Sequence, residues 1–95
     1  MEAVFKAPER VDSTNAATVQ EELFKFLDEE LEKGADAIAI DMSETGYLSS
    51  AGLRVMSSTY KKLKAEGVSF VLRDVTDGVR DLLDVTGLSG YLPME

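Results

Sequence analysis

Short apolar runs that alternate with longer amphipathic segments constrain this chain more than any other feature. Residues 37–40 and 68–73 have the length of strands and carry no charge before Asp41 and Arg73. Such runs are typical of strands buried on both faces, as in a parallel sheet. Apolar residues spaced three and four apart fill the segments between the runs, so the pattern predicts strands that alternate with helices.

The periodicity predicts the element order β-α-β-α-β-α-β. We expect strands at 4–7, 37–40 and 68–73, an edge strand at 91–94, and helices at 16–33, 50–65 and about 77–86, the last capped by Thr76 or Asp77. Glycines 34, 67 and 87 follow the helices, as glycine commonly does. This alternation implies an α/β fold with a mainly parallel, mixed sheet of four or more strands and three or more helices.

Length and composition exclude several classes of function. A chain of 95 residues forms one domain, expected to span 1–95, with little room for a deep cavity. It has neither cysteine nor histidine, which removes disulfides and the commonest general base and metal ligands. A formal charge of −8 disfavours nucleic acid. With no basic-apolar leader and no apolar run near the roughly 20 residues of a membrane span, we expect a cytoplasmic protein without membrane contact.

The segment Asp41 to Arg54 holds the residues most able to carry a function. Two adjacent hydroxyls, Ser49 and Ser50, lie where a loop meets a predicted helix. Serine is a preferred N-cap, so helix capping alone could account for the pair. A helix start also offers free N–H groups and a partial positive charge, so it tolerates a phosphate well. Ser49 can cap while Ser50 is modified, and both interpretations stay open on the residues alone.

This segment resembles the STAS-domain anti-sigma factor antagonists, the bacterial anti-anti-sigma proteins. Their pattern has a strand ending in aspartate, an aromatic residue, an apolar residue, an acidic residue or serine, the phosphorylated serine, a small residue, glycine and leucine. It corresponds here to Asp41 and to 47–53, YLSSAGL. Further matches are the turn after Arg10 and the stretch VRDLLDVTGL at 79–88, and the resemblance spans roughly 4–94.

The resemblance implies a partner-switching cycle in transcription regulation. The unphosphorylated protein would bind an anti-sigma factor with serine kinase activity and release a sigma factor. Phosphorylation of Ser50, with Ser49 as the alternative, would end the complex, and a metal-dependent serine phosphatase would reset it. The partner-binding residues are then expected to be Asp12, Thr14, Asn15, Ser49, Gly52 and Arg54. We expect no enzymatic activity, no cofactor and no bound metal. Gly52 is expected to keep the site uncrowded so that a partner can come close.

Two alternatives use the same residues differently. A Ser–His enzyme is impossible without histidine, and the spacing gives no support to a Ser–Lys dyad at Ser50. A STAS-type scaffold or regulatory domain, in a stress-signalling assembly or a transporter, is the main alternative function. Family members usually have a further strand before Val4 and a further helix at the end. Either the chain is a minimal member of the family, or its sheet is completed differently, for example by dimerisation. We expect a monomer or a weak dimer.

Charged clusters elsewhere are interpreted as solvated surface. Asp77, Asp81 and Asp84 fall on one helix face, but magnesium or calcium would need oxygen ligands from further segments. Lys61, Lys62 and Lys64 lie late in the second helix, where cations suit the helix dipole.

Overall fold

Three parallel strands form the main sheet of the computed structural model, which describes residues 1–95. The strands β1 (Glu2–Lys6), β3 (Ala37–Asp41) and β5 (Ser69–Arg73) pair in the order β1-β3-β5. A second, two-stranded parallel ladder joins β2 (Arg10–Val11) to β4 (Tyr47–Leu48). The α/β class and the parallel pairing predicted from the apolar runs are confirmed.

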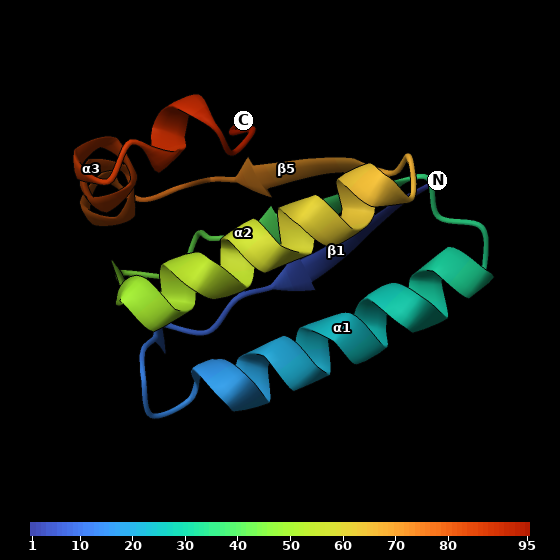
Figure 1. Cartoon of the computed structure of the whole chain (residues 1–95), viewed down its shortest axis with the longest axis horizontal. Helices are drawn as coiled ribbons and strands as arrows, with labels where there is room; N and C mark the ends of the chain where they lie inside the picture. The colour runs from blue at the N-terminus through green and yellow to red at the C-terminus, as the bar shows by residue number, and fades with distance from the viewer.

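Two long helices cover one face of this sheet. Helices α1 (Ala16–Glu32) and α2 (Ser50–Ala65) run side by side across it, and β1 is visible behind them (Figure 1). Helix α3 (Asp77–Val85) lies beyond the carboxyl end of β5, and a short 3-10 turn, Leu88–Gly90, follows it. The predicted helices are confirmed to within one residue at each end. The glycines predicted to end them at 34, 67 and 87 all have positive φ.

The core fills the space between these helices and the sheet. Its largest fully buried side chains come from both layers: Leu23 and Leu27 of α1, Met56 and Leu63 of α2, and Ile38, Ile40 and Leu72 of the strands. The alternation of strand side chains places Val4 on the opposite face, where it is 47% exposed. On that face Arg73 donates two hydrogen bonds of 2.7 and 2.8 Å to Glu2 and two of 2.9 and 3.4 Å to Glu95.

The ends of the sheet differ from the sequence-based expectation. The strand expected at 91–94 is reduced to one parallel bridge between Leu72 and Met94. Leu72 donates its N–H to Pro93 O over 2.9 Å and accepts one from Glu95 N–H over 2.9 Å. Proline has no N–H to continue a ladder, and the N–H groups of Tyr91 and Leu92 bond back to Leu88 O in the 3-10 turn. The main sheet therefore has three full strands where four were expected.

The short ladder of β2 and β4 was not predicted. Each strand has two residues within a polar stretch, too short for an alternation to be recognised. Long-range hydrogen bonds define it: Gly46 N–H to Glu9 O and Ser49 N–H to Val11 O, both 2.9 Å.

None of the helices is long and apolar enough to span a bilayer.

Candidate functional site

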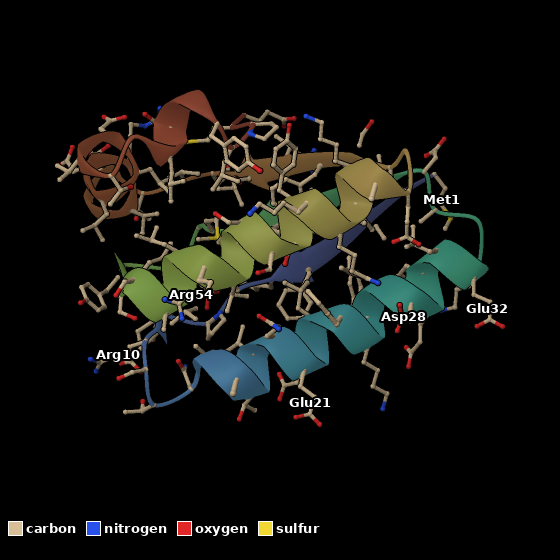
Figure 2. The ribbon with its side chains drawn as sticks, in the orientation of Figure 1. Met1, Arg10, Glu21, Asp28, Glu32 and Arg54 are labelled. Atoms are coloured by element: carbon tan, nitrogen blue, oxygen red, sulfur yellow. The ribbon has the colours of Figure 1, made fainter.

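The two-residue ladder brings the predicted site residues to one end of the molecule. It sets Arg10 opposite Tyr47 and Val11 opposite Leu48. The next residue on one side is Asp12, and on the other the chain enters α2 through Ser49. The loop after β1 and the start of α2 therefore meet beyond the carboxyl ends of β1 and β3. Figure 2 shows Arg10 and Arg54 at this same end.

Ser49 and Ser50 divide the two roles considered for them. Ser49 is the N-cap of α2: its Oγ accepts the Gly52 N–H over 3.4 Å, and its carbonyl accepts the Leu53 N–H over 2.9 Å. Ser50 is the first residue of the helix, and it is exposed to solvent. Its hydroxyl therefore lies where free helical N–H groups favour negative charge. The geometry places the cap on one serine and an accessible hydroxyl on the other.

Gly52 has a packing role, and not the expected role of leaving the surface open for a partner. The residue is buried, and a Cβ added there would collide with the carbonyl oxygen of Val11 and lie 3.1 Å from the Val11 Cβ. The missing side chain faces the protein interior, so it creates no open space for a partner. Gly52 instead lets the first turn of α2 pack directly against β2. The expectation that it keeps the surface uncrowded was wrong for this reason.

Asp12 is held in a tight turn between β2 and α1. Thr14 donates to its Oδ1 from the backbone N–H over 2.9 Å and from the hydroxyl over 2.5 Å. The Arg10 Nε lies 3.0 Å from the other oxygen. These hydrogen bonds from Thr14, with the charge of Arg10, hold the pKa of Asp12 below its usual value. Asp12 is therefore a fixed negative charge beside the entrance to α2.

Asn15 and Thr14 build this turn with their polar groups. The Asn15 Oδ1 accepts the Asp12 N–H over 2.8 Å, and its Nδ2 donates to Arg10 O over 2.9 Å. Thr14 stays exposed, although its hydroxyl is already bonded to Asp12. The polar atoms of both residues thus shape the Asp12 turn, whose exposed residues are Arg10, Ser13 and Thr14.

Thr45 is a site residue that sequence reasoning missed. It is fully buried, and its hydroxyl donates to Pro8 O over 2.7 Å. Its carbonyl accepts the hydroxyl of Thr76 over 2.7 Å. Thr76 is the N-cap residue of α3 by position, but its hydroxyl serves this contact rather than capping. We call these three residues, Pro8, Thr45 and Thr76, the loop latch. A threonine in a polar loop gives no sign of such a role in the sequence.

The surface around Ser50 is open and mixed in charge. A shallow hollow at the β2–β4 ladder is lined by Glu9, Arg10, Glu44, Gly46 and Tyr47. Tyr47 is 47% exposed and offers an aromatic ring at its edge. Lys6 forms an ion pair of 2.5 Å with Glu44, and Arg54 is exposed. A flat surface with an aromatic residue and several charges is suited to protein contact more than to enclosing a substrate.

Acidic residues do not gather into a metal site. No group of three carboxylates in the chain lies close enough together to hold an ion, and this includes Asp77, Asp81 and Asp84 of α3. Lys62 of α2 pairs with Asp28 of α1 and with Glu66, the residue that follows α2.

The parallel sheet, the two helices on one face and the serine pair that opens α2 define a small α/β recognition domain with no enclosed cleft. The family model of the STAS domain matches residues 2–95, and the chain belongs to this family. The anti-sigma-B factor antagonist of Bacillus subtilis is 32% identical over 82 residues, which cover 86% of this chain and 71% of that protein.

Solved structures agree with this assignment of the fold. A crystal structure of a Thermotoga maritima protein matches with a TM-score of 0.81 and 23% identity, covering 98% of this chain and 77% of that one. Unphosphorylated SpoIIAA, an anti-sigma factor antagonist, matches with a TM-score of 0.73 and 15% identity, covering 99% and 79%.

Proposed function

We propose that this chain is an anti-sigma factor antagonist switched by a phosphate on Ser50. The unphosphorylated form binds an anti-sigma factor with serine kinase activity, and a sigma factor is released. Phosphate transfer to Ser50 ends the complex, and a metal-dependent serine phosphatase restores the binding form. The protein acts in the cytoplasm as substrate and ligand, and it carries no catalytic group of its own.

One observation carries the proposal: Ser50 is exposed at the start of α2 while the neighbouring Ser49 caps the helix. A kinase can reach the Ser50 hydroxyl without unfolding the helix, because the cap does not depend on it. The relatives named as anti-sigma factor antagonists supply the class of partner. The exposed Tyr47 and the hollow beside it add a surface on which such a partner can pack.

The fixed charge of Asp12 explains why a phosphate would break the complex. A phosphoserine adds about −1.5 to −2 charges at neutral pH. The modified surface would then present this group together with the carboxylates of Asp12 and Glu44. A partner that packs closely must remove water from all of them, which costs binding energy. A coupling of about 3 to 4 kcal/mol corresponds to a loss of a few hundredfold in affinity.

The test measures binding of the cognate anti-sigma factor to three variants by calorimetry. Ser50→Asp is expected to weaken binding at least about tenfold, and Ser50→Ala is expected to bind as the wild type does. Ser69→Asp is the matched control, because Ser69 is exposed at the amino end of β5, away from α2's start. Incubation with the kinase, ATP and magnesium should add one phosphate to the wild type and none to Ser50→Ala. Equal affinity of Ser50→Asp and Ser69→Asp would refute the proposal.

A further inference from the structure

We infer that Arg54 is the intramolecular partner of a phosphate on Ser50, so that modification also withdraws a cation from the docking surface. This inference rests on the proposed function, since it concerns the state that phosphorylation creates. It assigns Arg54 as a positioning residue for the phosphate group. The switch would then combine an added dianion with the loss of a free guanidinium.

The spacing in α2 brings the two side chains together. Arg54 follows Ser50 by four residues, so both lie on the same side of the helix, with Cβ atoms about 5–6 Å apart. Helical side chains lean toward the amino end of the helix, so Arg54 extends back over the first turn, toward Ser50. Both residues are exposed, and Figure 2 shows Arg54 at the start of α2. No rearrangement of the backbone is needed for the contact.

Arg54 is also a cation that the unmodified structure leaves without an ion-pair partner at this end. Arg10 is paired with Asp12 over 3.0 Å, and Lys6 with Glu44 over 2.5 Å. Arg54 takes part in none of the ion pairs found in the chain. Its guanidinium is therefore available to an acidic group of a partner before modification, and to the phosphate afterwards.

The chemistry of the pair favours arginine over lysine. A guanidinium can donate two parallel N–H bonds to phosphate oxygens, whereas an ammonium acts as a point charge. The pair is exposed, so salt will screen it. Its measurable consequence is a lower second pKa of the phosphate, because Arg54 stabilises the doubly charged form more than the singly charged form.

The experiment uses the full chain with phosphoserine incorporated at position 50 during translation, titrated by phosphorus NMR between about pH 4 and about pH 8, around the second phosphate pKa. Without Arg54, in Arg54→Gln, the proton affinity of the phosphate is expected to rise about twofold, the size typical of a helical i,i+4 ion pair. Arg54→Lys should recover part of the difference. Lys61→Gln, which removes one charge from an exposed site on the same helix three turns away, should titrate as the parent chain does.

Identical titrations with and without Arg54 would overturn the inference. High salt should shrink the difference, and a difference that is independent of salt would also count against a direct ion pair. The titration needs neither kinase nor anti-sigma factor. Failure of the proposed function would appear separately, as unchanged partner affinity of Ser50→Asp or as no phosphate transfer to Ser50.

Discussion

The backbone N–H of Ser49 donates a 2.9 Å hydrogen bond to the carbonyl oxygen of Val11. These residues are far apart in the sequence, yet this one contact fixes where α2 begins relative to the Asp12 turn. The same carbonyl oxygen lies against Gly52, in the first turn of the helix. The position of Ser50 therefore depends on how closely α2 packs on β2.

Gly52→Ala is expected to destabilise the fold by about 1–3 kcal/mol, the usual cost of overpacking a filled site. The added methyl group would meet the Val11 backbone, which cannot turn aside as a flexible side chain can. Urea unfolding followed by circular dichroism measures the change. Gly46→Ala, in the same region, meets nothing within 4 Å and should change stability little. Equal stability of the two variants would contradict the packing role given to Gly52.

Thr45→Val is expected to cost about 1–3 kcal/mol, because it leaves the carbonyl of Pro8 without its hydrogen bond in a partly buried site. Thr59→Val is the matched control: Thr59 is equally buried, but its hydroxyl bonds to Val55 O within the same helix. Thermal unfolding of both variants gives the comparison. No measurable loss for Thr45→Val, with Thr59→Val unfolding as the wild type does, would show that the loop latch contributes little to stability.

The pH dependence of folding should carry a contribution from Asp12. Its pKa in the folded chain lies below the ordinary 3.8, because Thr14 and Arg10 favour the carboxylate. The folded chain thus binds this proton less readily than the unfolded chain. This stabilisation is complete at pH values above the pKa of Asp12 in the unfolded chain. It is lost as the pH falls through the lower pKa of Asp12 in the folded chain. NMR titration of Asp12 should give a midpoint below 3.8, and Thr14→Val should raise it; a midpoint unaffected by Thr14→Val would be the contrary result.

Ser49→Ala and Ser50→Ala should separate the two serines by stability. Loss of the Ser49 cap is expected to cost about 0.5–1 kcal/mol, at the lower end for caps because the hydrogen bond to Gly52 is long. Ser50→Ala should be nearly neutral, since alanine is the best helix former and the cap stays in place. Chemical unfolding measures both. A larger cost for Ser50→Ala would reverse the assignment of cap and modification site.

Local periodicity was sufficient to predict most of the fold. The stripe of α2, including Leu53, Met56 and Leu63, gave the helix its correct bounds, because each of these side chains is buried against the sheet. The stretch Ala37–Asp41 was predicted for the same reason, since its three central residues are buried. Burial recurs at every turn of a helix and at every second residue of a half-buried strand. It therefore leaves a periodic pattern of apolar residues in the sequence.

The site was predicted less completely, because its contacts are made between distant segments. The motif placed Ser49 and Ser50 at a helix start, and the structure agrees. The pairing of Val11 with Leu48 and the latch at Thr45 depend on single long-range hydrogen bonds, which leave no periodic trace in a sequence. The role predicted for Gly52 was also wrong, because a glycine in a motif does not indicate whether the missing side chain would face solvent or the protein interior.

The loop latch has a consequence for association. Thr45 joins the loop after β3 both to Pro8 and, through Thr76, to the start of α3, so this surface is ordered before any partner arrives. Binding of a partner would then cost little conformational entropy on this side of the interface. A surface with a low entropy cost binds more tightly for the same contacts. In the switch proposed above, partner exchange would then be governed by the charge at Ser50, while the shape presented to each partner stays the same.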